Sequence, residues 1–229
     1  MEFIIIAIIT IVLTIILGIV FEYNMKELKH IADNKELDGL AQKYPSNFDI
    51  CKYYLKKLNN ENVKIEEDEN GETSLYIAIT NKIIIANISN TYTRIQTIAH
   101  ECLHSVQNRK LLIFNFIFSN IYLLYFTIIC ILAILQLLPY KIIFLVVLIL
   151  FSMVYCIVRI YLENDAMIKA RYLAKEYLEE TKISNIEEIN KLVKGFDYIN
   201  SFGIKAMNFK FFFDCMVKVL IFLIICIIR

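Results

Sequence analysis

The sequence lacks several features that would place it in a common class. None of its six cysteines forms a CxxC pair, which excludes a zinc-finger set and argues against a disulfide framework. It has only three histidines, and it has no internal repeat or low-complexity segment. The formal net charge is +1. The chain therefore lacks the excess of basic residues typical of nucleic-acid-binding proteins, and it has no acidic tail.

Apolar residues, in contrast, are in excess. They make up 58% of the 229 residues, against roughly 45–50% in soluble domains, and the mean hydropathy is +0.57. Charged residues still make up 21%, so apolar and charged residues must be segregated along the chain. Four of the cysteines lie in apolar runs, and we expect reduced thiols, either cytoplasmic or buried in lipid. These four are Cys130, Cys156, Cys215 and Cys226.

Four apolar runs predict four membrane-spanning helices, because about 20 apolar residues span a bilayer core. We interpret the first as a retained anchor rather than a cleaved signal peptide, since it is long, Glu2 stands where a basic segment would, and no A-x-A site follows. Only the residues around Pro139–Lys141 separate the second run from the third, which predicts a tight helical hairpin. The runs are residues 3–21, 111–138, 142–158 and 211–228.

The polar segments between these runs predict a small soluble part. Short β-branched segments at 74–79 and 82–88, joined around Asn81, predict a strand pair. Thr93 and Gln96 have capping-box spacing at the start of a predicted helix. We therefore expect a mainly α membrane protein with a small α+β domain. Its expected organisation is an anchor (1–21), a polar part (22–110), a membrane hairpin (111–158), a helical region (159–210) and a C-terminal membrane helix (211–229).

Basic residues near the span ends predict the orientation, since Lys and Arg favour the cytoplasmic side. The side opposite the two polar regions has only Lys141 and Arg229. We therefore expect both polar regions to be cytoplasmic. Their basic residues near the spans are Lys26, Lys29, Arg109, Lys110, Arg159, Lys169, Arg171, Lys205 and Lys210.

The segment TIAHECLHSVQ, residues 97–107, places two histidines four residues apart around a glutamate. On a helix His100 and His104 share one face and can bind one metal ion. Glu101, on the adjoining face, can take a proton from water whose pKa zinc lowers to about 7. This HExxH pattern predicts a zinc hydrolase helix. The alternative is a solvated helix near the membrane whose polar residues have no special role.

A catalytic zinc ion needs a third protein ligand and an open coordination position. The remaining histidine, His30, follows the first span on an amphipathic helix, and we expect it to be solvated or packed. Lys110 stands where a metzincin has its third histidine. Glu163 follows the third span by about five residues, and His104 precedes the second span by about seven, which is roughly 10 Å along a helix. An antiparallel hairpin would therefore bring this carboxylate towards the histidines.

With these residues in view, the chain resembles a known family. AHECLHSVQ, followed across a membrane hairpin by ENDAMIKA, is similar to the bacterial membrane-bound neutral zinc metallopeptidases of the YugP-like family, which show HExxHxxQ and a later glutamate–x–x–alanine. That family is similar to HtpX-like and CAAX prenyl proteases, which are gluzincins. The resemblance covers about residues 1–225 and implies zinc ligands at His100, His104 and Glu163, with Glu101 as the general base. Leu103 departs from the family, which often has glycine beside the second histidine.

The resulting hypothesis is a zinc-dependent endopeptidase in the bacterial plasma membrane, with its site facing the cytoplasm. We expect membrane proteins or membrane-proximal peptides as substrates, the lipid bilayer as surroundings, and no nucleic-acid partner. The edge of segment 82–88 is expected to pair with an extended substrate. One alternative is a catalytically inactive zinc-binding scaffold, although binding alone would not need Glu101. Another is an intramembrane metalloprotease, but the motif precedes the apolar run and no LDG motif follows any span.

Several other residues have a functional and a structural interpretation. Gln107 either braces a metal ligand or faces water, and Asp165 either orients a histidine or is a helix-surface carboxylate. We expect Cys102 to be a packing residue. Asp214 and Lys218 are expected to pair within their helix, the alternative being a polar lining for a substrate path. Interhelical hydrogen bonds are predicted for Asn115, Ser119, Asn120 and Gln136.

Overall fold

The structure is a computed structural model that describes residues 1–22, 34–71, 73–88 and 90–228, so the prediction for His30 falls outside the described residues. The chain divides into two compact units, which we call unit 1 and unit 2. Unit 1 contains α1, residues 114–161 and the residues from 205 onward, and unit 2 contains the described residues of 24–113 and residues 162–204.

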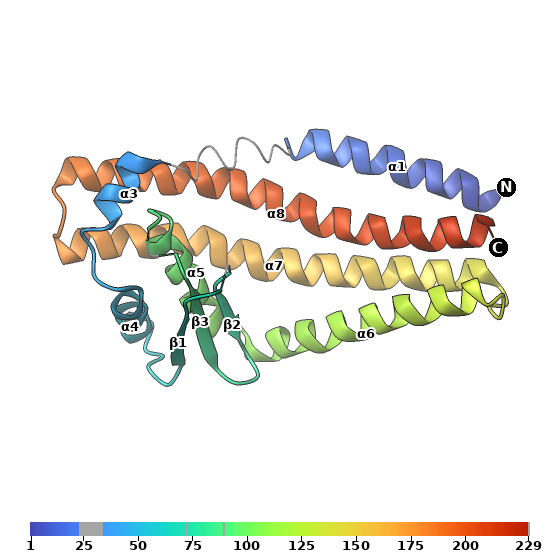
Figure 1. Cartoon of the computed structure of the whole chain (residues 1–229), viewed down its shortest axis with the longest axis horizontal. Coiled ribbons are helices and arrows are strands. Elements are labelled where there is room, and N and C mark those ends of the chain that lie inside the picture. The colour runs from blue at the N-terminus through green and yellow to red at the C-terminus, as the bar shows by residue number, and fades with distance from the viewer. Residues whose placement is uncertain (23–33, 72, 89, 229) are drawn as a thin grey trace. The chain divides into compact units, whose positions relative to one another are not determined.

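Unit 1 consists of helices α1 (Glu2–Val20), α6 (Arg109–Ile134, from residue 114), α7 (Lys141–Thr181, to residue 161) and α8 (Ile186–Ile228, from residue 205), shown in Figure 1. All four helices are long and apolar enough to cross a membrane. The prediction of four candidate membrane-spanning helices is therefore confirmed.

The predicted hairpin forms, but its turn is longer than expected, from residue 135 to residue 140. Gln136 lies in this turn with a φ of 58° and not in a helix. The predicted interhelical bonds are wrong for Ser119 and Asn120, which donate to carbonyls of their own helix, those of Asn115 at 2.6 Å and Phe116 at 2.7 Å. The carbonyl four residues back is within reach of such side chains, so it outcompetes a neighbouring helix.

Tyrosines make the hydrogen bonds between helices α6 and α7 in unit 1. The Tyr122 hydroxyl bonds the Ser152 hydroxyl at 2.8 Å, and the Tyr125 hydroxyl donates to the Phe144 carbonyl at 3.0 Å. On α8, the Lys218 ammonium donates to the backbone carbonyl of Asp214 at 3.3 Å and lies 5.4 Å from the centre of the Tyr122 ring. The expected local contact within α8 therefore uses the backbone of Asp214.

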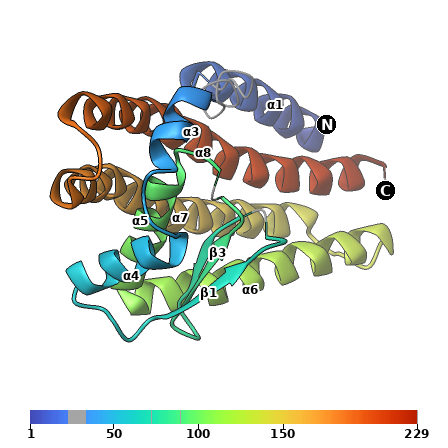
Figure 2. The same ribbon diagram turned by 60° about the vertical axis from the view of Figure 1, so that its left-hand side comes forward.

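Unit 2 contains α3 (Lys35–Ala41), α4 (Asn47–Lys57), a three-stranded sheet and α5 (Arg94–Val106), together with the polar halves of α7 and α8. Figure 2 shows the sheet with α4 and α5 close to it. A continuous apolar core joins these elements. Its largest fully buried side chains include Tyr54, Tyr92, Tyr177, Phe196, Ile95 and Ile98.

The strand order of the sheet is β1 (Lys64–Asp68), β3 (Lys82–Ala86), β2 (Leu75–Ile77). β2 and β3 are antiparallel, which confirms the predicted strand pair, whereas β1 is parallel to β3 and was not predicted. Because strands flank β3 on both sides, the prediction that its edge pairs with a substrate is wrong. The two outer strands are β1 and β2.

The capping box predicted at the start of α5 is also wrong. Thr93 occupies the N-cap position, but its backbone is helical, with a φ of −65° and a ψ of −16°, and its side chain makes no capping bond. The hydroxyl bonds that of Thr91 at 3.2 Å instead. A helical N-cap directs the side chain away from the free amides of the first turn, so spacing alone does not produce the motif.

Candidate metal site

Helix α5 carries the HExxH motif and is amphipathic. Ile95, Ile98 and Cys102 are fully buried in the core of unit 2, at the helical spacing of one face. Cys102 packs against Cys51 of α4 with 3.6 Å between their sulfur atoms, so the packing role predicted for it is confirmed. With this face fixed in the core, the face that carries His100 and His104 is directed away from it.

A buried arginine fixes the first turn of α5. The Arg94 guanidinium donates to the carbonyls of Ala41, Tyr44 and Pro45 and to the Asn47 side chain, each at 2.8–2.9 Å. These acceptors belong to the link between α3 and α4, and burial lowers the pKa of Arg94. One side chain thus joins the start of the motif helix to two other helices.

The end of α5 is held by a second polar contact. The Asn60 side-chain amide donates to the carbonyl and hydroxyl of Ser105, at 3.0 and 2.9 Å. The helix ends at Val106, and Gln107 adopts an extended backbone with a φ of −68° and a ψ of 167°. The chain therefore leaves the helix two residues after the second histidine.

Three side chains converge on one point of unit 2. The Nε2 atoms of His100 and His104 are 3.0 Å apart, and a carboxylate oxygen of Glu163, on α7, lies 3.4 Å from the first and 3.6 Å from the second. All three ligand atoms lie within 4.8 Å of one another, so these residues could hold a metal ion. We call His100, His104 and Glu163 the metal group. Ligands about 2.0–2.1 Å from a tetrahedral ion stand about 3.3 Å apart, close to these separations.

Gln107 determines which nitrogen of His104 faces this point. The Gln107 side-chain NH₂ donates to the Leu162 carbonyl at 2.8 Å and to the Asp165 carboxylate at 2.9 Å. Its oxygen therefore faces the Nδ1 atom of His104, 2.8 Å away, and accepts that proton. The Nε2 lone pair of His104 is left free to bind a metal.

Asp165 does not contact a histidine directly. Its carboxylate accepts from Gln107 and forms an ion pair with Lys169, one turn further along α7, at 2.5 Å. These contacts lower the pKa of Asp165, although its partial burial opposes the shift. The hydrogen-bonded link from Asp165 to His104 therefore runs through Gln107.

Burial and neighbouring charges shift the pKa values in the site. Burial raises the pKa of Glu101, against the opposing effect of the two histidines. For Glu163, which lies beyond the apolar part of α7, burial alone would raise the pKa, but the neighbouring imidazoles of His100 and His104 hold it well below its usual value. For His104 burial would lower the pKa, but the bond to Glu163 raises it. Glu163 and His104 thus stabilise one another's charge.

Glu101 lies between the metal group and the sheet. One of its carboxylate oxygens is 3.9 Å from Nε2 of His100, and the backbone amide of Tyr76, on strand β2, lies near enough to lower the pKa of this carboxylate. The Tyr76 hydroxyl in turn donates to the Asn81 side chain at 2.9 Å, at the turn between β2 and β3. Strand β2 is therefore the strand beside the site.

Sequence reasoning missed the contributions of backbone atoms. The Leu162 carbonyl positions Gln107, and the Tyr76 amide contacts Glu101. Backbone groups are present at every position, so no residue type marks them in the sequence. The partner of Asp165 did carry a signal, because Lys169 follows it at the spacing of helical ion pairs.

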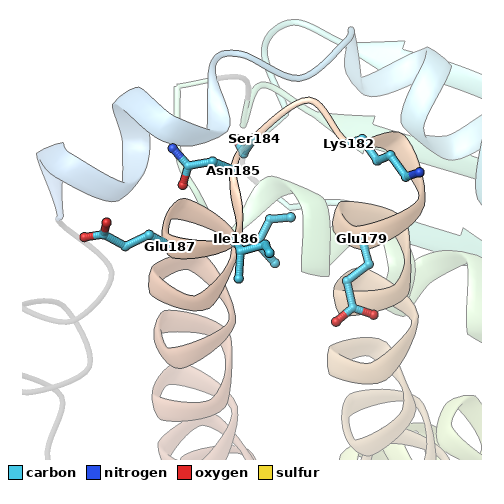
Figure 3. Close-up of a pocket in the computed structure, with 7 residues that line it drawn as sticks. Glu179, Lys182, Ser184, Asn185, Ile186 and Glu187 are labelled. Carbon is cyan, nitrogen blue, oxygen red and sulfur yellow. The ribbon is translucent and has the colours of Figure 1, made fainter.

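A hollow elsewhere in unit 2, at the turn between α7 and α8, carries no comparable chemistry. Figure 3 shows the Lys182 and Glu187 side chains pointing away from each other. None of the three metal-group residues lines the hollow. The lining consists of Glu179, Lys182, Ser184, Asn185, Ile186, Glu187 and Ile189.

No protein-family model matches the chain, and no curated protein or solved structure shows a significant similarity to it. Inferences about function therefore depend on the geometry of the site and on the sequence motifs.

Proposed function

We propose that the chain is a membrane-bound zinc metallopeptidase of the gluzincin type, similar to the YugP-like family. The observation that carries this proposal is the convergence of His100, His104 and Glu163 with the Glu101 carboxylate beside them. A site that only stored or sensed a metal would not need this additional buried carboxylate.

The donor set favours zinc. Two imidazole nitrogens and one carboxylate oxygen are the ligands of known catalytic zinc sites, which keep a fourth position open, whereas structural sites use four protein ligands. Magnesium and calcium prefer oxygen ligands alone. When bound, zinc would polarise a scissile carbonyl and lower the pKa of water.

Glu101 is the proposed proton carrier. Its carboxylate would take a proton from the attacking water and return it to the leaving amine. Burial raises its pKa towards neutrality, which helps it to accept and then release the proton.

Strand β2 is the proposed docking strand for an extended substrate peptide. It is an outer strand, and its Tyr76 amide contacts the general base. A peptide added to this edge would be held by main-chain hydrogen bonds, with little dependence on its sequence. This assignment replaces the one made from sequence, in which β3 was the edge.

Membrane attachment supports membrane proteins or membrane-proximal peptides as substrates. The motif helix α5 is not among the four helices that could span a membrane, which disfavours an intramembrane protease. Glu163 lies two residues beyond the last residue of unit 1 along α7, so the chain itself keeps the ligand near the predicted span. The distribution of basic residues favours a cytoplasmic site in a bacterial plasma membrane.

The test is hydrolysis of casein, or self-cleavage, by the purified full chain. Glu101→Gln should abolish cleavage while the protein still binds zinc, because the amide cannot accept the proton. Glu61→Gln, an exposed substitution of the same kind, should leave cleavage unchanged. Full activity of Glu101→Gln would refute the proposed mechanism.

The second candidate is a zinc-binding scaffold without catalysis, which the same metal group supports. It predicts bound zinc in the wild-type chain and no cleavage that depends on Glu101. The assay above therefore separates the two functions.

A further inference from the structure

Two cysteines in unit 1 lie closer together than any other thiol pair recorded among the described residues. The sulfur atoms of Cys156, on α7, and Cys215, on α8, are 3.1 Å apart, and both side chains are buried. Each thiol also donates a hydrogen bond to a backbone carbonyl of the opposite helix. The Cys156 thiol donates to the Phe211 carbonyl on α8 at 3.4 Å, and the Cys215 thiol donates to the Ser152 carbonyl on α7 at 3.6 Å.

The thiol pair is part of a polar cluster within an apolar bundle. Ser152, whose carbonyl accepts from Cys215, also bonds the Tyr122 hydroxyl at 2.8 Å. The Lys218 ammonium lies over the Tyr122 ring, and Lys218 follows Cys215 by three residues on the same face of α8. Polar and charged groups inside a membrane are costly and tend to mark functional positions, and reactive cysteines typically have a cation nearby.

We propose that Cys156 and Cys215 are a redox-active thiol pair that closes to a disulfide between α7 and α8. The sulfur atoms need to approach by only about 1 Å, because a disulfide bond is about 2.05 Å long. The proposal is independent of the peptidase function.

The oxidant is a small hydroperoxide, a class of molecule that can enter the bilayer. One sulfur attacks an oxygen of the peroxide and the O–O bond breaks; that oxygen stays on the sulfur as a sulfenic acid, and the other oxygen leaves as water or alcohol. The other thiol then attacks the sulfenic sulfur, the S–S bond forms, and the hydroxyl leaves as water with the remaining proton. Overall two S–H bonds and one O–O bond break, the thiols lose two electrons, and the peroxide gains them.

A second thiol pair provides an internal comparison. Cys51 and Cys102 in unit 2 are also buried, but their sulfur atoms are 3.6 Å apart. These sulfur atoms must approach further than those of Cys156 and Cys215 before an S–S bond of about 2.05 Å can form. This pair should remain reduced under conditions that oxidise Cys156 and Cys215.

The test is hydrogen peroxide treatment of the purified full chain in lipid nanodiscs, followed by alkylation under denaturing conditions and peptide mass spectrometry without reduction. Cys156 and Cys215 should lose alkylation together and appear as one cross-linked peptide, and a reductant should restore both. Cys51 and Cys102 should stay alkylated. In Cys156→Ser, Cys215 should instead react with dimedone, a probe for sulfenic acid.

Two outcomes would overturn the proposal. One is complete alkylation of Cys156 and Cys215 after peroxide treatment. The other is a loss of alkylation that is equal at all six cysteines, which would show unselective oxidation. Cleavage activity does not enter the test, so its outcome stands apart from that of the proposed function.

Discussion

At the scale of single residues, Gln107 connects the two helices that supply the metal group. It accepts from His104 and donates to the Leu162 carbonyl and to Asp165 on α7. The helix that carries Glu163 is thereby tied to the histidine through one side chain. The site thus depends on a hydrogen-bonded residue that does not itself offer a metal ligand.

Gln107→Ala should weaken zinc binding by about 10–100-fold, the usual effect of removing a partner of a ligating histidine. The imidazole ring of His104 would then be free to turn either nitrogen towards the metal. The hydrogen bonds that join Gln107, at the end of α5, to Leu162 and Asp165 on α7 would also be lost. Competition with a zinc-chelating dye measures the affinity. The matched control is Gln42→Ala, an exposed glutamine in the same unit. Wild-type affinity in Gln107→Ala would contradict the bridging role.

The sequence predicts part of this arrangement at the residue scale. The spacing of His100 and His104 follows from helical geometry, and the two antiparallel spans pointed to Glu163 as the third ligand. The two bonds made by the Gln107 amide depend on a carbonyl and a carboxylate 55 and 58 residues further along the chain. No local pattern in a single sequence encodes such a pairing.

At the scale of elements, α5 is the helix whose placement matters most for the site. Its apolar face packs in the core of unit 2, Arg94 fixes its first turn, and Asn60 fixes its last. Packing alone leaves a helix free to shift along its axis, whereas hydrogen bonds at both ends set its position. The histidines are therefore positioned by contacts remote from the metal group.

Arg94→Ala should destabilise unit 2 by roughly 3 kcal/mol, because each buried acceptor left unpaired costs about 1–3 kcal/mol. Arg94→Lys should recover little, since an ammonium has three donors without the planar geometry of the guanidinium. Thermal unfolding in detergent can be followed with a thiol-reactive fluorophore that labels Cys51 and Cys102, with the other four cysteines replaced by alanine.

The control for this experiment is Arg109→Ala, which removes an exposed arginine of the same unit. It should leave the unfolding temperature nearly unchanged. If Arg94→Ala unfolds at the same temperature as Arg109→Ala, the guanidinium does not fix the helix.

The sheet illustrates why elements are predicted unevenly. The β-branched residues of β2 and β3 predicted their pairing, whereas β1, with the sequence KIEED, is acidic and mostly exposed and lacks apolar alternation. Strand β1 forms along the edge of β3 that β2 leaves unpaired. The Glu66 side chain of β1 forms an ion pair with Lys82 of β3 at 2.8 Å. A strand that depends on its neighbour carries little signal of its own.

At the scale of the whole molecule, apolar and polar segments alternate along one chain and assemble into two units. Helices α6, α7 and α8 each contribute residues to both units. The segregation of charge predicted this organisation, because runs without charge can cross lipid and the charged segments cannot. The prediction of which side of the membrane the polar regions face rests only on the count of basic residues near the spans.

That orientation can be tested with single cysteines in the two connecting turns. A membrane-impermeant thiol reagent should label Gln136→Cys in intact cells, and should label Lys182→Cys only after the membrane is opened. Both positions are exposed, and the six native cysteines are buried, so the new thiols should dominate the signal. Labelling of Lys182→Cys in intact cells, with Gln136→Cys protected, would invert the topology.

The most direct test of the central claim is the metal content of the purified full chain, measured by mass spectrometry of the elements. We predict one zinc ion per chain in the wild type and in Glu101→Gln, and loss of the zinc in Glu163→Ala. Glu179→Ala, a glutamate on the same helix outside the metal group, should keep it. A wild-type chain without zinc, or zinc retained in Glu163→Ala, would contradict the assignment of the site.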